Sequence, residues 1–203
     1  ANSPFLARLA ESYLAAPVGV VPPVIEPGAY RIARNGDAVL FVNPVAIKGV
    51  HIAAAVAARL PHRRFLFARS WHDTEQHPHV EVRLPNVEWL APMDDMRPAL
   101  ARTRLVLVPS VWEESSARIV GEAQVSGIPA VASDRGGLGD SVGPGGIVLS
   151  LAEPIEAWCG AVESLFADAA RYAALSAGAL GHAARPDYLP EGALARFLEW
   201  IGA

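Results

Sequence analysis

Short, uninterrupted apolar runs recur along the chain between residues 38 and 150. Within each run the apolar positions do not alternate with polar ones, and the segments between the runs mix both kinds. Continuous runs of this kind are typical of strands that are covered on both faces, as in parallel sheets. The pattern predicts strands at 38–43, 64–68, 87–91, 104–109, 128–133 and 146–150.

Most of the intervening segments carry apolar residues at helical spacing. They predict helices within 49–60, 93–104 and 117–127, and two or three more from Pro154 to Gly181 and from Glu191 to the end. Strands that alternate with helices favour a right-handed, doubly wound sheet. We therefore predict an α/β fold with a mostly parallel, six-stranded Rossmann-like sheet, whose ligand site lies at the carboxyl ends of the strands.

The segment before residue 35 has a different character. Ser3 followed by Pro4 is a typical helix start and predicts a helix toward Pro17. The prolines of residues 18–30 argue against a helix there and predict an extended connector. Three parts are thus expected: a helix with a Pro-rich connector (1–34), a Rossmann-like domain (35–185), and a C-terminal helix that packs back toward the connector or a missing domain (186–203).

Charge and cysteine content narrow the function classes. The 203 residues carry 17 Lys and Arg against 21 Asp and Glu, a net charge of −4, and show no basic stripe. Nucleic acid and anionic membranes are therefore not expected partners. Cys159 is the sole cysteine, which excludes an internal disulfide and a Cys-based zinc site and favours a reducing, cytoplasmic compartment. No apolar run approaches the roughly 20 residues of a membrane span.

Candidate chemistry begins directly after the first predicted strand, in the segment from Asn43 to Gly49. It contains neither the glycine-rich turn of dinucleotide-binding oxidoreductases nor the Gly-Lys-Ser/Thr of a P-loop. Lys48, the single lysine among the 17 basic residues, lies close to the next predicted helix, where backbone N–H groups also attract phosphate. A solvated lysine that opens a helix is the alternative interpretation.

Two carboxylates bracket the helix predicted after the fourth strand. Ser115 and Ser116 are suitable N-caps, and the helix N-terminus is a second anion site on the same edge of the sheet. If the helix begins at Ser116, Glu122 lies about 9 Å along its axis, close to the span of a diphosphate, while Glu114 precedes the helix. One carboxylate could then hold sugar hydroxyls and the other a ribose diol. A charged first turn with a solvated glutamate is the alternative.

Taken in order, these motifs resemble a known family. They are N-P-x-x-x-K-G after the first strand, P-S-x-W-E-E before the helix, E-x7-E from Glu114 to Glu122, and G-I-P-x-V-A-S followed by Gly136-Gly137. The combination resembles the C-terminal, nucleotide-sugar-binding domain of retaining GT-B glycosyltransferases of the family 4 type, over residues 38–150 and more loosely outside them.

The resemblance implies a role for each matching position. It implies a nucleoside-diphosphate sugar of the UDP or GDP type as donor substrate, with no metal and no further cofactor. Lys48 would neutralise the diphosphate, Glu114 would contact the transferred sugar and stabilise charge at the reacting carbon, and Glu122 would bind the ribose hydroxyls. The amides of Ser116, Ala117 and Arg118 would face the phosphate or sugar, and the backbone of residues 88–90 would lie near the base.

The chain departs from the family pattern in three ways. Asn43 stands where the family often has arginine, so one phosphate cation is missing unless another arginine reaches in. Ser116 and Ala117 replace the common Phe-Gly. The length leaves room for one of the two GT-B domains, so an N-terminal domain with the acceptor site is expected as a missing partner. The acceptor, whether glycan, lipid or small molecule, has no signature here.

Other interpretations carry less weight. A catalytically degenerate nucleotide-binding or protein-interaction module of the same fold remains the alternative function, and a sugar-nucleotide epimerase is a third. The G-x-S-x-G spelled by residues 139–143 lacks the strand–turn–helix context of a serine hydrolase. The polar loop that contains His72, His77 and His79 with Asp73, Glu75 and Glu81 has no recognised metal geometry and is interpreted as solvated.

Overall fold

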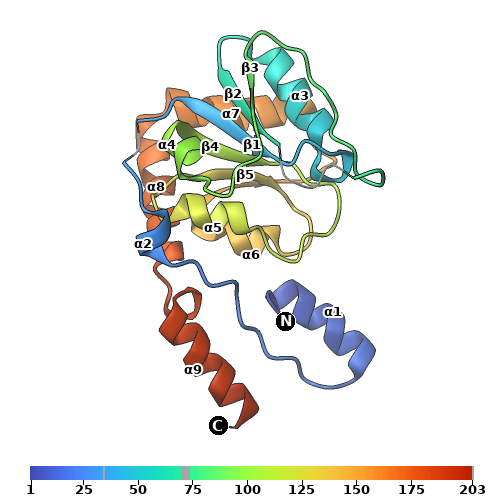
Figure 1. Cartoon of the computed structure of the whole chain (residues 1–203), viewed down its shortest axis with the longest axis vertical. Coiled ribbons are helices and arrows are strands. Elements are labelled where there is room, and N and C mark those ends of the chain that lie inside the picture. Colours follow the sequence, from blue (N-terminus) through green and yellow to red (C-terminus); the bar gives the residue numbers. More distant parts are fainter. Residues whose placement is uncertain (34, 70–73, 203) are drawn as a thin grey trace.

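The computed structural model describes residues 1–33, 35–69 and 74–202. Within these residues, six strands form one sheet in which every neighbouring pair is parallel, with the order β3-β2-β1-β4-β5-β6 (Figure 1). The strands are β1 Ala38–Val42, β2 Arg64–Ala68, β3 Val87–Leu90, β4 Thr103–Val108, β5 Ala130–Ser133 and β6 Gly146–Leu149. The predicted doubly wound α/β fold is confirmed.

Helices cover both faces of this sheet. The helices of the described residues are α1 Pro4–Leu14, α2 Pro27–Tyr30, α3 Val50–Arg59, α4 Arg97–Ala101, α5 Arg118–Gln124, α6 Leu138–Val142, α7 Ile155–Ala167, α8 Ala169–Ala183 and α9 Pro190–Ile201, of which α1, α2 and α9 lie away from the sheet. Buried residues of α3 and α7 form one core with the sheet, and buried residues of α4 and α5 form a second core on the opposite face. This two-sided covering explains why the strands are apolar throughout.

The middle strand β1 illustrates this arrangement. Val39 and Phe41 are buried in the core with α3 and α7, whereas Ala38 and Leu40 are buried in the core with α4 and α5. Because side chains along a strand point alternately to the two faces, every position of the strand must be apolar.

Two helices were not predicted. The connector is not wholly extended, because α2 forms at Pro27–Tyr30; a proline at the first helical position loses no hydrogen bond there. Helix α6 forms at Leu138–Val142 inside a glycine-rich segment. Leu138 and Val142 are fully buried, and their burial offsets the conformational entropy lost when the chain is ordered.

The connector packs against the C-terminal helix and α5. A Cβ atom added to Gly19 would lie 2.6 Å from the Trp200 ring of α9, so the connector backbone passes directly over that indole. A Cβ on Gly121 of α5 would lie 2.2 Å from Ile25 Cδ1, so the connector and α5 are in close contact as well. Figure 1 shows α1, the connector and α9 together on the side of the sheet that carries α5 and α6.

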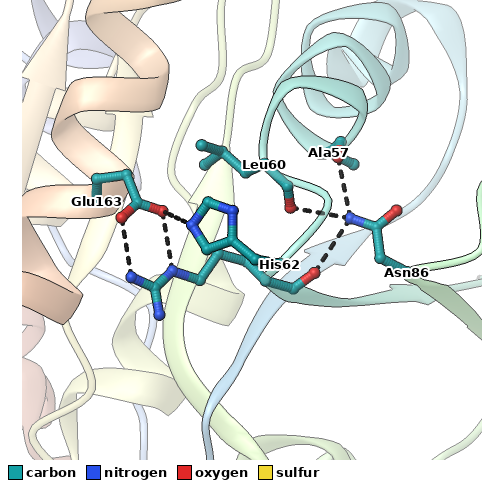
Figure 2. A network of polar contacts seen from close by, with 6 residues as sticks. Ala57, Leu60, His62, Asn86 and Glu163 are labelled. Atoms are coloured by element: carbon teal, nitrogen blue, oxygen red, sulfur yellow. Dashed lines mark hydrogen bonds and ion pairs between the residues drawn. The ribbon is translucent and has the colours of Figure 1, made fainter.

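Side-chain contacts stabilise the turns at the amino ends of β2 and β3 (Figure 2). The Asn86 amide nitrogen, just before β3, lies 2.9, 3.1 and 3.1 Å from the carbonyl oxygens of Ala57, Leu60 and Arg63, at the end of α3 and in the turn to β2. Arg63 donates to both carboxylate oxygens of Glu163 on α7, at 2.9 and 2.8 Å, and His62 Nε2 lies 3.0 Å from Glu163 Oε1. The turn between α3 and β2 is thereby joined to α7.

We expect this ion pair to make stability depend on pH. The hydrogen bonds from Arg63 hold the pKa of Glu163 below its ordinary value. A depressed carboxylate pKa contributes stability above the unfolded pKa, and that stability is lost as the pH falls through the folded pKa. Glu163→Gln should therefore lower the free energy of unfolding by about 1 kcal/mol at neutral pH, and the difference from the wild type should disappear in acid. Urea denaturation at both pH values measures it.

Glu156→Gln is the matched control. Glu156 lies on the same helix and pairs with Arg59, but its side chain is 69% exposed. Its replacement should change the free energy of unfolding by less than about 0.5 kcal/mol at either pH. A Glu163→Gln difference of the same size at neutral and acidic pH would contradict the assignment.

Candidate functional site

A cavity of about 320 Å³ lies between the ends of β1 and β4 and the start of α5. Its apolar lining includes Phe41, Val42, Met96, Val108 and Ile119. Seven residues that the sequence singled out for the site also line it: Asn43, Lys48, Glu114, Ser116, Ala117, Arg118 and Glu122. The cavity is at the carboxyl edge of the parallel sheet, where ligands of such sheets bind.

The turn that carries Lys48 is shaped by glycine. The short 3-10 helix Ala46–Lys48 ends at Gly49, whose φ of +76° lies in the left-handed region. A Cβ on Gly49 would lie 1.9 Å from Pro109 O, so this turn touches the chain that leaves β4. Val111 N–H also donates to Ile47 O at 3.0 Å. The segments after β1 and β4 therefore hold one another.

Lys48 and Glu114 form an ion pair inside the cavity. Lys48 Nζ donates to Glu114 Oε1 at 2.7 Å, and Ser110 Oγ donates to the same oxygen at 2.6 Å. The Glu114 side chain is 8% exposed and that of Lys48 is 23% exposed. The ammonium also lies 4.9 Å from the centre of the Trp112 ring, a cation–π contact. Among the described residues Glu114 Oε2 has no hydrogen-bond partner, so it can accept one from a ligand.

The loop that carries Glu114 rests on two glycines. Gly136 has a φ of +59°, and a Cβ there would lie 2.2 Å from Glu114 O and 2.7 Å from Glu114 N. A Cβ on Gly137 would lie 2.3 Å from Ser115 O, and the Gly137 N–H donates to Glu114 O at 2.7 Å. The Gly-Gly pair after β5 thus fixes the backbone of Glu114.

The start of α5 corrects the predicted serine caps. The helix begins at Arg118 with Ala117 at the N-cap, and neither Ser115 nor Ser116 caps it. These groups instead form hydrogen bonds with residues that are distant in the sequence. Ser115 Oγ accepts from the Asn2 amide at 3.3 Å, and the Ala117 N–H donates to Ser141 Oγ at 3.1 Å. With the helix starting at Arg118, Glu122 lies about 6 Å along the axis rather than 9 Å.

Glu122 is paired with an arginine one turn before it. Arg118 Nε donates to Glu122 Oε1 at 2.7 Å, and the Glu122 side chain is 8% exposed. The hydrogen bonds of Arg118 to Tyr30 and to Glu122 raise the pKa of the guanidinium. Among the described residues, Arg118 is the one arginine that lines the cavity. It supplies a second cation there besides Lys48.

Asn43 ends β1 in an unusual conformation. Its φ of +63° is left-handed, a region in which Asn is one of the few tolerated non-glycine residues. Its side-chain oxygen is buried and has no hydrogen-bond partner among the described residues. A buried acceptor without a donor costs free energy, which a donor from a ligand in the cavity would recover.

Residues 88–90 do not line the cavity. They form most of the edge strand β3, and Glu88 pairs with Arg102 and with Arg64, which lowers the pKa of its carboxyl. Met96, just before α4, lies against the cavity instead. Ser110 was also missed as a partner of Glu114, although its position directly after the fourth strand is a signal that could have indicated it.

The described residues contain no group of three or more His, Cys, Asp or Glu side chains that could hold a metal ion. His72 and Asp73, which belong to the polar loop considered for metal binding, lie outside the described residues. Ser141 of the G-x-S-x-G segment lies inside α6, where its hydroxyl donates to Gly137 O at 2.9 Å. In the part of the chain that the structure covers, no helix is long and apolar enough to span a membrane.

Several curated proteins are similar in sequence. The chain is 35% identical over 105 residues to a D-inositol 3-phosphate glycosyltransferase of Corynebacterium kroppenstedtii, a match that covers 50% of this chain and 23% of that protein. It is 43% identical over 81 residues to a protein of the same name from Rhodococcus erythropolis, covering 39% of this chain and 18% of that protein. The matched region is thus about a fifth of each relative's length.

Solved structures share the fold. Anabaena Alr3699/HepE, crystallised in complex with UDP-glucose, superposes with a TM-score of 0.83 at 19% identity, covering 100% of this chain and 62% of that one. A glycosyltransferase from Rickettsia africae superposes with a TM-score of 0.81 at 12% identity, covering 98% and 61%. These matches agree with the GT-B resemblance of the sequence motifs. Residues 36–168, about two thirds of the chain, match the family described as glycosyl transferases group 1, and the chain belongs to that family.

Proposed function

We propose that this chain is the donor-binding domain of a retaining glycosyltransferase of the family 4 type. It binds a nucleoside-diphosphate sugar of the UDP or GDP type, and the sugar passes to an acceptor bound by a further domain. One observation carries this proposal: two cations and two carboxylates from separate segments line one cavity at the carboxyl edge of the sheet.

The residues divide the donor between them. Lys48 neutralises the diphosphate as the bond between the sugar carbon and the phosphate oxygen breaks, because a fixed charge stabilises a leaving group without reorganisation. An ammonium has three donors, so Lys48 can keep Glu114 Oε1 while it binds phosphate. Glu114 Oε2 accepts from the sugar and stabilises positive charge at its reacting carbon. Glu122 takes the ribose hydroxyls, and the amides of Ser116 and Arg118 approach the phosphates.

The relatives support this assignment. The curated relatives are named D-inositol 3-phosphate glycosyltransferases, and the Anabaena protein was crystallised with UDP-glucose. We further propose that no metal is needed, since Lys48 and Arg118 can supply the positive charge. The free thiol of Cys159 supports a cytoplasmic location.

Calorimetric titration with UDP, GDP and ADP tests the proposal. We expect one of the three nucleotides to bind. Glu122→Ala should lower the affinity for that nucleotide by about 10-fold, because a hydrogen bond to a charged acceptor contributes about 1.5–3 kcal/mol. Glu153→Ala is the control, since Glu153 is exposed on the surface outside the cavity. Failure of all three nucleotides to bind would refute the donor-site assignment.

A catalytically degenerate nucleotide-binding or protein-interaction module is the second candidate. It is favoured by Asn43 in place of an arginine and by the Ala117 N–H, which is already bonded to Ser141. This candidate predicts that the longer protein, with its acceptor domain, binds the nucleotide without releasing sugar from the donor. Product formation with the same anomeric configuration as the donor would instead establish a retaining transferase.

A further inference from the structure

The Glu122 carboxylate is connected to the N-terminal connector through a chain of hydrogen bonds. Arg118 Nε donates to Glu122 Oε1 at 2.7 Å, and another nitrogen of the same guanidinium donates to the Tyr30 hydroxyl at 2.9 Å. Tyr30 ends α2, 88 residues before Arg118 in the sequence. A planar guanidinium donates through a rigid fork, so fixing one branch also orients the other.

The position of Tyr30 is itself fixed by α5 and the turn after it. The Ile32 N–H donates to Ser126 Oγ at 2.9 Å, and Ser126 Oγ donates to Tyr30 O at 3.3 Å. Ile25 packs against Val125, with Tyr30 beside them. The backbone next to Tyr30 is therefore tied to the turn that directly follows the helix carrying Arg118 and Glu122.

The geometry leaves one oxygen of Glu122 for a ligand. Arg118 takes Oε1, and Oε2 has no hydrogen-bond partner among the described residues. The Arg118 side chain is 62% exposed and has many rotamers, so without a second contact it would not hold the carboxylate in one orientation. The Tyr30 hydroxyl supplies that contact. Removing the hydroxyl leaves the Tyr30 ring, 6.0 Å from the Arg118 guanidinium carbon, but no directed hydrogen bond to orient the guanidinium and, through it, Glu122.

We propose that Tyr30 is a positioning residue for the nucleoside part of the donor site, acting through Arg118 on the carboxylate that binds the ribose hydroxyls. The inference rests on the proposed donor site and extends it to a residue that does not line the cavity. It makes the connector part of the ribose specificity of this chain. The effect is expected on the discrimination between ribose and deoxyribose, not on nucleotide binding in general.

The test compares UDP, GDP or ADP, whichever binds most tightly, with its 2′-deoxy analogue by calorimetry. In the wild type we expect the ribonucleotide to bind about 10-fold more tightly than the deoxy form. Glu122→Ala should reduce this ratio to near one, and Tyr30→Phe should reduce it by about 3-fold. The double variant Tyr30→Phe/Glu122→Ala should show the same ratio of ribonucleotide to deoxynucleotide affinity as Glu122→Ala alone, because both substitutions act through one carboxylate.

Tyr13→Phe is the control, since the Tyr13 side chain is 82% exposed on α1. It should leave the ratio unchanged, as should any variant that merely loosens the fold. An unchanged ratio in Tyr30→Phe, with the ratio lost in Glu122→Ala, overturns the role of Tyr30 and leaves the donor site intact. A wild type that binds none of the three nucleotides overturns the proposed function and this inference together.

Discussion

Lys48→Ala is expected to weaken nucleoside-diphosphate binding by about 10- to 100-fold. A charge-assisted hydrogen bond to a phosphate contributes about 1.5–3 kcal/mol, and its loss accounts for this range. The variant also leaves the Glu114 carboxylate, which is 8% exposed, with Ser110 as its remaining partner, so an uncompensated negative charge faces the diphosphate. Titration of the variant with the best-binding nucleotide measures the change.

One further variant and one further nucleotide test whether the charge of Lys48 is responsible. Lys48→Ala/Glu114→Gln removes the repulsive carboxylate as well, and we expect it to recover part of the lost affinity, since the two charges act on one another. The corresponding nucleoside monophosphate should lose less affinity than the diphosphate in Lys48→Ala. Equal losses for both nucleotides would place Lys48 away from the terminal phosphate and contradict the assignment.

Gly136→Ala should damage both the stability of the fold and the site. A left-handed conformation costs an L-residue about 1–2 kcal/mol, and the added Cβ would also lie 2.2 Å from Glu114 O, so the backbone must shift. We expect the free energy of unfolding to fall by about 2–4 kcal/mol in urea denaturation. Because the displaced loop carries Glu114, the variant should also bind the nucleotide more weakly at a temperature where it remains folded.

Gly139→Ala provides the matched control three residues further on. Gly139 lies within α6, and a Cβ there would meet nothing within 4 Å. Alanine is the better helix former by about 0.8–1 kcal/mol, so this variant should be as stable as the wild type or more so. A Gly136→Ala protein that is no less stable than Gly139→Ala would show that the close contact with Glu114 is unimportant.

The sheet could be predicted because its signal is local. The bounds of each strand agree with those of a continuous apolar run to within two residues. The order of strands and helices was sufficient to predict a parallel, doubly wound arrangement. Helix α6 could not be found in this way, because its glycine-rich sequence has little helical preference and forms a helix where Leu138 and Val142 enter the core. The serine caps failed for a related reason: Ser115 and Ala117 have partners that are distant in the sequence.

The site was predictable as a set of residues but not as a set of contacts. Lys48 and Glu114 follow β1 and β4, which are neighbours in the sheet, so topology places them on one edge. Their 2.7 Å pairing joins residues 66 positions apart, and no pattern in the sequence indicates it. The contact from Tyr30 to Arg118 joins residues 88 positions apart. It also involves the short helix α2, which was not predicted because the prolines of the connector favoured an extended chain.

The single lysine has a practical consequence. Lys48 carries the one side-chain amine in the sequence, and the structure places that amine inside the cavity. A reagent that acylates amines therefore has one side-chain target in the whole chain. The mass added at Lys48 becomes a direct measure of whether the cavity is filled or empty, and it can be determined in a mixture of ligands without labelling any of them.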